Sequence, residues 1–286
     1  MKGQIVKVIS NDYTVKYEDK KIVCKARGVF RNRNITPLAG DYCLFDVDNK
    51  LITDILDRKN ELKRPPVSNI DYAIIVMSTV EPDFSTTLLD KMIDIIEFNN
   101  IKPIICISKS DLSFTDKIKE YINYYKNIGY NVLLNTEIDE LLKIIDNNTV
   151  ILTGQSGAGK SSLLNRLDSN LNLKTDEISM ALGRGKHTTR AIEFYEMGNS
   201  LIADTPGFSS LNFDDMSKEE IRDNFIEFNK YRDNCKYRDC MHIKEDECEI
   251  RNLVGTKILE DRYENYVSFI KEKENGDISI DFKRKR

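Results

Sequence analysis

One eight-residue segment near the middle of the 286-residue chain constrains the fold more than any other feature. It reads Gly154-Gln155-Ser156-Gly157-Ala158-Gly159-Lys160-Ser161 and matches the pattern G-x-x-x-x-G-K-[ST]. The apolar run 149–153 before it predicts a buried strand, and residues 161–167 after it predict a helix. A glycine-rich turn between a strand and a helix can direct backbone N–H groups at phosphate oxygens, with the positive end of the helix behind them. We therefore expect a phosphate site formed by this segment and Ser162, in which Lys160 reaches the β and γ oxygens and Ser161 binds Mg²⁺.

The region around this segment alternates between two patterns. Apolar runs at 72–77, 104–107 and 132–134 predict buried strands, while residues 88–96 and 114–128 show helical periodicity, the latter ending at Gly129, where a helix C-cap belongs. Alternating strands and helices imply a parallel sheet covered by helices on both faces. We expect an α/β nucleotide domain that spans residues 65–215.

The N-terminal part of the chain is built differently. Short alternating segments predict five strands, separated mostly by turn pairs such as Asn11-Asp12, and a barrel of the OB type would leave no exposed strand edge. Arg64-Pro65-Pro66 is expected to interrupt regular structure, because neither proline can donate to a ladder. We therefore expect an all-β domain over residues 1–64, with strands at 4–9, 13–17, 22–27, 41–47 and 51–56.

Composition and charge limit the class of protein. Hydrophobic residues make up 40% of the chain and charged residues 31%, which excludes both a disordered chain and a membrane bundle. No apolar run is long enough to span a bilayer and Met1-Lys2-Gly3-Gln4 opens no signal peptide, so we expect a cytoplasmic protein without a membrane partner. The net charge is −4, yet residues 1–35 hold nine Lys and Arg against three Asp and Glu, and the chain ends Lys283-Arg284-Lys285-Arg286. Basic ends suit a polyanion, although solvated faces and a frayed tail explain the same charge pattern.

The last part of the chain carries a cysteine cluster. Three of the six cysteines fall within 14 residues beside one of the two histidines, a spacing that indicates metal rather than a disulfide in a cytoplasmic chain. We expect a helical zinc-binding domain over residues 216–286. One structural Zn²⁺ would be held in a closed tetrahedral site by Cys235, Cys240, His242 and Cys248. The other cysteines, Cys24, Cys43 and Cys106, fall in predicted strands and are expected in the core.

Two further motifs bear on the nucleotide. Asp204-Thr205-Pro206-Gly207 follows the predicted strand 200–203 and has the form D-x-x-G, in which Asp204 orients Mg²⁺ through water and the Gly207 N–H senses a γ-phosphate. Ser108-Lys109-Ser110-Asp111 follows the strand 104–107 and resembles the guanine-reading [NT]-K-x-D motif. There Asp111 would accept hydrogen bonds from guanine N1–H and N2–H₂, and Lys109 would pack over the base. Ser108 stands in place of asparagine, which bears on nucleotide affinity, and the same four residues could simply start a helix.

The order of the motifs is unusual. Asp111 precedes Gly154 by 43 residues, whereas ordinary P-loop GTPases carry the guanine motif near the end of the domain. We therefore infer a circularly permuted domain, which is physically tolerable because domain termini often lie close together. The segment 183–190, which lies between the phosphate-binding segment 154–161 and Asp204, corresponds to switch I in its position along the chain. Thr188 and Thr189 are both candidate Mg²⁺ ligands there, although an ordinary basic surface loop is the alternative.

These motifs together resemble those of one family. In chain order they are Ser-Lys-Ser-Asp, Gly-Gln-Ser-Gly-Ala-Gly-Lys-Ser-Ser, Gly-x-Gly-x-His-Thr-Thr, Asp-Thr-Pro-Gly-Phe and Cys-x4-Cys-x-His-x5-Cys. The whole chain resembles the bacterial ribosome small-subunit-dependent GTPase A family. The resemblance implies a barrel and a zinc domain that grip the rRNA of the small ribosomal subunit. It also implies hydrolysis of GTP to GDP and phosphate, accelerated by that subunit, which drives release late in subunit maturation.

The sequence leaves the catalytic group open. Many small GTPases place a glutamine just after D-x-x-G, but Phe208 occupies that position here and cannot orient a water molecule. We expect His187 to swing toward the γ-phosphate when the ribosome orders its loop, or else to contact RNA or solvent. We expect a monomer, since a protein that docks on a particle needs no second copy. Two other functions stay open, a P-loop ATPase or kinase and an RNA-binding protein with a passive nucleotide site.

Overall fold

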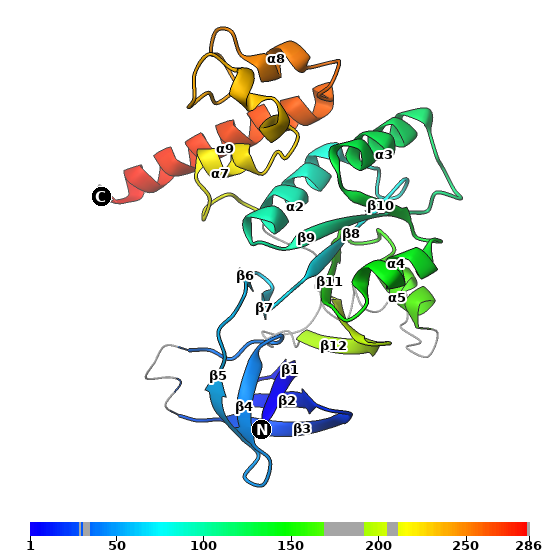
Figure 1. Cartoon of the computed structure of the whole chain (residues 1–286), viewed down its shortest axis with the longest axis vertical. Helices are drawn as coiled ribbons and strands as arrows, with labels where there is room; N and C mark the ends of the chain where they lie inside the picture. Colours follow the sequence, from blue (N-terminus) through cyan, green and yellow to red (C-terminus); the bar gives the residue numbers. More distant parts are fainter. Residues whose placement is uncertain (29, 31–34, 169–191, 205–210, 285–286) are drawn as a thin grey trace. The chain divides into compact units, whose positions relative to one another are not determined.

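The computed structural model describes residues 1–28, 30, 35–168, 192–204 and 211–284, with side chains through residue 276 (Figure 1). It divides into two compact units. The first unit comprises Met1–Pro82, Ile104–Ser113 and Leu133–Ser209. The second comprises Asp83–Pro103, Phe114–Val132 and Ser210–Arg286. The predicted division into domains at 64 and 215 stays a prediction.

Five strands at the start of the first unit form the predicted barrel (Figure 1). Strand β1 pairs with both β2 and β4, and a parallel pairing of β3 with β5 completes the ring. Alternate side chains point inward, so that Ile5, Val15, Cys24, Cys43 and Phe45 are buried in one core. The strands are β1 (Lys2–Ile9), β2 (Asp12–Tyr17), β3 (Lys20–Ala26), β4 (Tyr42–Asp46) and β5 (Leu51–Ile55).

A second group of strands continues from the barrel into the sheet that carries the candidate site. The order is β10-β9-β8-β11-β13-β12, and β12 pairs with β1 of the barrel. Strand β11 lies between β8 and β13 and is parallel to both, as expected for an α/β domain. The bounds are β8 (Tyr72–Ser78), β9 (Lys102–Ser108), β10 (Asn131–Leu134), β11 (Thr149–Gly154), β12 (Ile192–Met197) and β13 (Ser200–Asp204).

The predicted parallel arrangement holds where β11 pairs with β8 and β13, but the sheet also contains an antiparallel strand that the sequence analysis did not predict. Strand β12 runs antiparallel to β13, with Met197 opposite Ser200. Only Gly198 and Asn199 separate the two strands, and Gly198 has a φ of 59°. A two-residue connection can join only antiparallel neighbours, because a parallel pair needs a crossover of a dozen or more residues.

The expectation that Arg64-Pro65-Pro66 interrupts regular structure holds for Arg64 and Pro65, which form a turn between two strands, and is wrong for Pro66, which begins a strand. Strands β6 (Glu61–Lys63) and β7 (Pro66–Ser68) form a small antiparallel hairpin around it, with Lys63 opposite Pro66. Proline is tolerated at the first residue of a strand, although it has no N–H group to donate to the neighbouring strand. Arg64 and Pro65 therefore mark a tight turn between the two strands.

Helices α4 (Ile138–Ile145) and α5 (Lys160–Leu167) belong to the first unit and lie next to each other beside β11 (Figure 1). Leu141, Ile145, Leu163 and Leu164 on these helices share a buried cluster with the sheet strands. The helix predicted after the phosphate loop is therefore confirmed. Its packing holds the first turn of α5 against the end of β11.

The second unit is helical. Ser85, Thr115 and Ser217 cap three of its helices by accepting a hydrogen bond from a backbone N–H, and Gly129, with a φ of 123°, ends α3 as predicted. A core rich in phenylalanine and tyrosine joins the later helices, and it includes Cys240 and Cys248. The helices are α2 (Thr86–Phe98), α3 (Asp116–Ile128), α7 (Lys218–Asp223), α8 (Glu249–Leu253) and α9 (Glu260–Arg284), with short 3₁₀ turns η1 (Phe228–Lys230) and η2 (Arg232–Asn234).

Candidate functional site

The segment Gly154–Ser161 lies where its sequence predicts, between the end of β11 and the start of α5. Gly154 has a φ of 138°, and a Cβ at this position would lie 2.3 Å from the carbonyl oxygen of Val76 on β8. Gly159 is left-handed, with a φ of 94°, and is the N-cap of α5. Both positions therefore require glycine, and the resulting turn brings backbone N–H groups to the positive end of a helix.

Lys160 places a positive charge inside this turn. Its Nζ donates to the carbonyl oxygens of Gly154 and Gln155, each at 2.9 Å. Burial lowers the pKa of Lys160, and the nearby Asp204 carboxylate opposes that shift. A partly desolvated ammonium beside a helix N-terminus is well suited to an anionic ligand.

Asp204 ends β13 directly beside Leu152 of β11. Its Oδ1 atom is buried, with no hydrogen-bond partner among the described residues. Burial raises the pKa of Asp204 to about 6, while Lys160 acts in the opposite direction. A buried carboxylate oxygen without a donor suits a hard divalent cation, and Ser161 in the first turn of α5 offers a hydroxyl. These residues therefore fit Mg²⁺, which would neutralise phosphate charge there.

The loop after β9 lies against the phosphate loop. Ser108 is 1% exposed, and its Oγ donates to the carbonyl oxygen of Ala158, with the carbonyl oxygen of Met77 3.4 Å away. A Cβ on Gly159 would lie 3.5 Å from the Ser108 side chain. The structure therefore brings two motifs together that are far apart in the sequence.

A neighbouring loop that the sequence analysis did not single out supports Lys109. The Thr79 hydroxyl donates to the Lys109 carbonyl oxygen at 2.7 Å, and the Lys109 ammonium donates to the Glu81 carbonyl oxygen. Lys109 has a φ of 56°, a strained conformation that these contacts hold. Asp111 is exposed beyond it. Residues 79–82 match no motif, so nothing in the sequence pointed to their role.

Several predicted site residues lie outside the described residues. These are the candidates His187, Thr188 and Thr189, together with Gly207 and Phe208. Their predicted roles stay predictions.

In the second unit, Cys235, Cys240, His242 and Cys248 come together as the sequence predicts. One possible ligand atom from each residue lies within 4.8 Å of all the others. The Nδ1 atom of His242 lies 3.6 Å from Cys235 Sγ and 3.4 Å from Cys248 Sγ, and the two sulfurs are 4.0 Å apart. Sulfur ligands of a tetrahedral Zn²⁺ lie about 3.8 Å apart, given Zn–S bonds of about 2.3 Å. The donor set and its spacing therefore fit zinc.

The burial of this cluster also favours a metal. Burial raises the pKa of the Cys240 thiol to about 12, and it lowers the pKa of His242 to about 4. A neutral imidazole is the form that binds metal, whereas thiolates form here only if a cation offsets the cost of burial.

Residues outside the cysteine motif hold the cluster in place. The Glu245 carboxylate accepts from the backbone N–H groups of Met241, Ile243 and Lys244 at 2.9 to 3.0 Å. The Tyr263 and Tyr266 hydroxyls of α9 donate to the carbonyl oxygens of His242 and Met241. The sequence analysis missed all three side chains, and only the position of Glu245 between two predicted ligands could have drawn attention to it.

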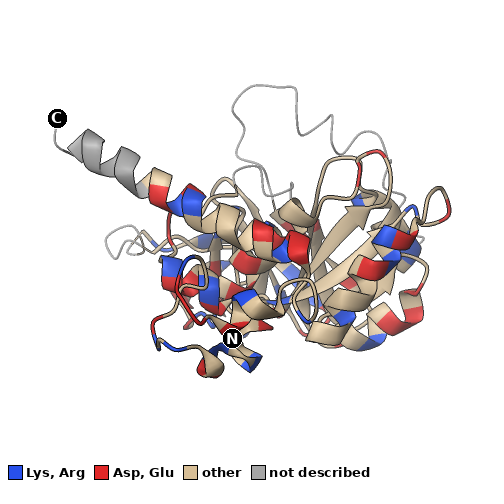
Figure 2. Cartoon of the chain, turned by 90° about the horizontal axis from the view of Figure 1, so that it is seen from above, with Lys and Arg blue, Asp and Glu red and all other residues tan. Residues whose placement is uncertain are grey.

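Other sequence expectations concern the core and the surface. Cys24, Cys43 and Cys106 are buried, as predicted. Figure 2 shows basic and acidic residues interspersed on the described helices and strands. Among the described helices, none combines the length and the apolar character that a membrane span requires.

Comparison with known proteins connects this arrangement to one family. The family model described as RsgA GTPase matches residues 55–214, and the model described as RsgA N-terminal domain matches residues 2–52. The Listeria monocytogenes protein named small ribosomal subunit biogenesis GTPase RsgA 2 is 48% identical over 285 residues, which covers 96% of this chain and 98% of the relative. The Bacillus cereus protein named small ribosomal subunit biogenesis GTPase RsgA is 47% identical over 282 residues and covers 94% and 96% of the two chains.

Solved structures agree with the sequence relatives. YloQ, described as a circularly permuted GTPase, superposes with a TM-score of 0.80 at 37% identity, covering 96% of this chain and 95% of the other. YjeQ from Thermotoga maritima superposes with a TM-score of 0.81 at 33% identity, covering 95% and 97%. The permuted order predicted from the motifs is confirmed, and the chain belongs to the RsgA family of circularly permuted GTPases.

Proposed function

We propose that this protein binds the small ribosomal subunit late in its maturation, hydrolyses GTP to GDP and phosphate when the subunit stimulates it, and then dissociates. One observation carries the proposal. The end of β9, with its Ser108-Lys109-Ser110-Asp111 loop, lies against the phosphate loop in space although it precedes that loop in the chain. Relatives that share nearly the full length of this chain are named for small-subunit biogenesis, which supports the choice of partner.

The nucleotide roles follow from the two loops. Backbone N–H groups from Gly154 to Ser162, together with Lys160, would hold the phosphates. Ser161 and Asp204 would hold Mg²⁺, directly and through water, with Thr188 or Thr189 completing its coordination and Gly207 contacting the γ-phosphate. Mg²⁺ would supply charge neutralisation on the phosphate oxygens. Asp111 would select guanine, because adenine lacks the N1–H and N2–H₂ donors.

Hydrolysis would depend on ordering of the segment that contains His187. With Phe208 unable to hydrogen-bond, we assign the positioning of the attacking water to His187. Positioning and electrostatics supply most of the catalysis in phosphoryl transfer, so intrinsic turnover should be slow and subunit-bound turnover fast. On this assignment, His187→Ala lowers stimulated turnover and leaves GTP affinity unchanged. An equal loss of both would contradict it.

The parts of the chain before and after the nucleotide site would bind the small ribosomal subunit. The barrel, with its basic N-terminal segment, and the zinc-holding helices would contact rRNA. Zn²⁺ would be structural, since four protein ligands leave no open position for chemistry. We place the protein in the cytoplasm, where it would act as a monomer.

A base-specificity swap tests the nucleotide assignment. Asp111→Asn should weaken GTP binding and strengthen binding of xanthosine triphosphate, whose base presents an acceptor where guanine presents a donor. Ser110→Ala, in the same loop, serves as the control and should keep the preference for GTP. If Asp111→Asn leaves the ratio of the two affinities unchanged, Asp111 does not read the base.

A further inference from the structure

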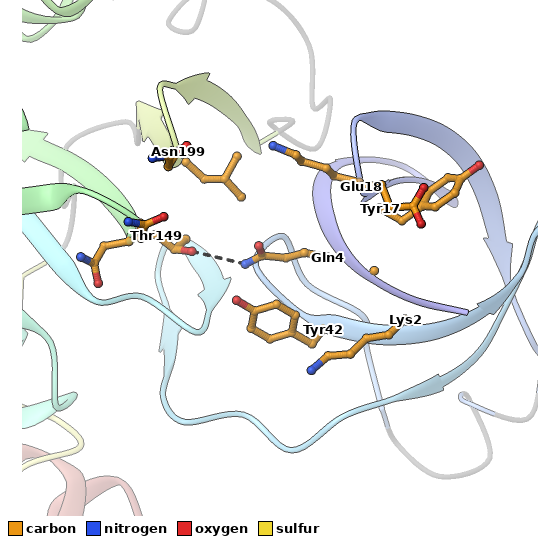
Figure 3. Close-up of a pocket in the computed structure, with 12 residues that line it drawn as sticks. Lys2, Gln4, Tyr17, Glu18, Tyr42, Thr149 and Asn199 are labelled. Carbon is orange, nitrogen blue, oxygen red and sulfur yellow. Dashed lines mark hydrogen bonds between the residues drawn. The ribbon is translucent and has the colours of Figure 1, made fainter.

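A pocket of about 320 Å³ within the first unit lies apart from the phosphate loop. Figure 3 shows Lys2 and Tyr42 on the barrel side of this pocket and Thr149 and Asn199 on the side of the sheet. The volume is at the lower end of the roughly 300–1,000 Å³ typical of small-molecule sites. The pocket therefore has room for one flat group of nucleobase size.

The barrel side of the pocket offers an aromatic face. Tyr42 begins β4 and is 38% exposed, whereas the next residue, Cys43, points into the barrel core. The Lys2 ammonium lies 5.1 Å from the centre of the Tyr42 ring. Exposed aromatic rings with neighbouring cations are the usual platform for single-stranded nucleic acid, because every base has a π face and every nucleotide carries a phosphate.

The side of the sheet offers hydrogen-bond acceptors. The side-chain nitrogens of Asn147, Asn148 and Asn199 all donate to Asp146, at 2.8, 2.7 and 3.2 Å. This shared partner fixes the orientation of the three amides, and within the described part of the chain nothing donates to their side-chain oxygens. Each amide keeps an oxygen without a donor among the described residues and one further N–H, and the three oxygens can accept from a ligand that presents several N–H donors.

The charges of the pocket favour a neutral ligand over a bare phosphate. Lys16 is paired with Glu196 at 2.6 Å, and the exposed Glu18 lies among the lining residues. Lys2 makes no ion pair with any residue that the structure describes, and it lies on the exposed surface. A neutral base inside the pocket, with its phosphate near Lys2, matches this distribution.

We propose that this pocket binds one unstacked nucleobase of single-stranded RNA and prefers bases with an exocyclic amino group. Tyr42 stacks on the base, the asparagine oxygens accept from its amino group, and Lys2 leaves the ring to pair with the phosphate. Uracil has no amino group and offers only its single N3–H donor between two carbonyl acceptors, so it is the disfavoured base. The proposal rests on the proposed function, which supplies RNA as the partner, and it adds a specific contact to it.

Binding of short oligonucleotides to the full-length protein tests the pocket directly. Fluorescence anisotropy compares labelled hexa-adenylate, hexacytidylate and hexauridylate. We expect the first two to bind at least about 5-fold more tightly than the third, and Tyr42→Ala to weaken hexa-adenylate binding by about 5- to 20-fold. Tyr42→Phe should retain affinity because it keeps the stacking face.

Matched variants separate the pocket from the rest of the barrel. Leu44→Ala is the control, since Leu44 lies on the same strand, is 39% exposed and does not line the pocket. It should bind like the unmodified protein. Asn199→Ala acts from the other side of the pocket and should reduce the preference for adenine over uracil without any change to the barrel.

Three results would overturn the proposal: no binding of hexa-adenylate at the highest protein concentration, equal affinity for all three oligonucleotides, or equal losses in Tyr42→Ala and Leu44→Ala. GTP turnover of the unmodified protein with small ribosomal subunits is measured separately. Stimulated turnover without Tyr42-dependent binding would reject the pocket and keep the proposed function. Tyr42-dependent binding without stimulation would reject the proposed function and keep the pocket.

Discussion

The hydroxyl of Ser108 donates a hydrogen bond to the carbonyl oxygen of Ala158, which ties the end of β9 to the phosphate loop. Both residues are 1% exposed, and 50 positions separate them in the chain. The bond places the proposed base-reading loop beside the proposed phosphate loop, as a nucleotide that contacts both would require. The serine at position 108 has a shorter side chain than the asparagine that usually begins this guanine-reading motif, but its hydroxyl still connects the two loops.

Loss of this bond should weaken nucleotide binding. In Ser108→Ala the Ala158 carbonyl oxygen stays buried without its donor, at a cost of about 1–3 kcal/mol. We expect GTP affinity to fall about 5- to 10-fold, measured by titration with a fluorescent GTP analogue. Ser110→Ala, in the same loop but less buried, is the control. Equal affinities for Ser108→Ala and the control would show that the brace does not support the site.

Asp204 should make the nucleotide-free protein less stable at neutral pH. Burial raises its pKa from 3.8 in the unfolded chain to about 6 in the folded protein. The folded state therefore favours the protonated form, and the stability this provides is present below pH 3.8 and lost as the pH rises through 6. Asp204→Asn should thus raise the free energy of unfolding by up to about 2 kcal/mol at pH 7.5, and by little near pH 4.

Urea denaturation of the two proteins at both pH values measures this difference, and GTP turnover is measured on the same samples. We expect the more stable variant to lose turnover, because its neutral amide no longer orients Mg²⁺. A variant that is less stable than the original protein at pH 7.5 would contradict the assignment.

Arg262 should be the most sensitive charged residue in the helical unit. It is 1% exposed and pairs with Asp90 at 2.6 Å and with Glu227, and Asp90 also accepts from Tyr125 and Asn265. Arg262→Met leaves two buried carboxylates without their cation, so the free energy of unfolding should fall by about 3–5 kcal/mol. Lys218→Met, which removes the exposed pair with Glu274, should cost less than about 1 kcal/mol. Chemical denaturation checks both values, and comparable losses would refute the special role of Arg262.

Glu245 should make the stability of the folded protein depend on pH through the loop that carries the cysteine cluster. Burial acts to raise the pKa of its carboxyl, but backbone N–H groups of the loop outweigh that effect and lower it from 4.5 to about 2. The stabilisation is present above pH 4.5 and is lost as the pH falls toward 2. Glu245→Gln should therefore lower stability by about 2 kcal/mol at pH 7, with a smaller difference from the original protein at pH 3.

Thermal unfolding at both pH values, together with the zinc content of the purified protein, checks this expectation. Glu249→Gln is the control, because this neighbouring carboxylate accepts no loop N–H group that the structure describes. A pH-independent difference between Glu245→Gln and the original protein would mean that the carboxylate charge does not organise the loop.

The sequence predicted correctly those features that a local pattern of residues determines. The five barrel strands follow the alternation of apolar residues, and the turn at Gly154 and Gly159 needs left-handed or close-packed backbone that only glycine provides. The cysteine cluster could be predicted because only a few residue types serve as zinc ligands. These features depend on neighbours in the chain.

The features that it missed are of two kinds: local turns and loops whose residues are not distinctive, and contacts with partners far away in the chain. The antiparallel direction of β12 is set by the Gly198-Asn199 turn, which was not recognised between two apolar runs. Arg262 and Asp90 are 172 positions apart, and Glu245 is an ordinary acidic residue until its loop closes around it. Nothing in the local sequence distinguishes these side chains from the many charged residues on the surface.

GTP turnover by the purified full-length protein, with and without small ribosomal subunits, tests the central claim most directly. ATP serves as the nucleotide control and large subunits as the particle control. The account predicts slow hydrolysis of GTP by the protein alone and a strong increase with small subunits only. Unchanged turnover on addition of small subunits, in a protein that binds GTP and carries its zinc, would contradict it.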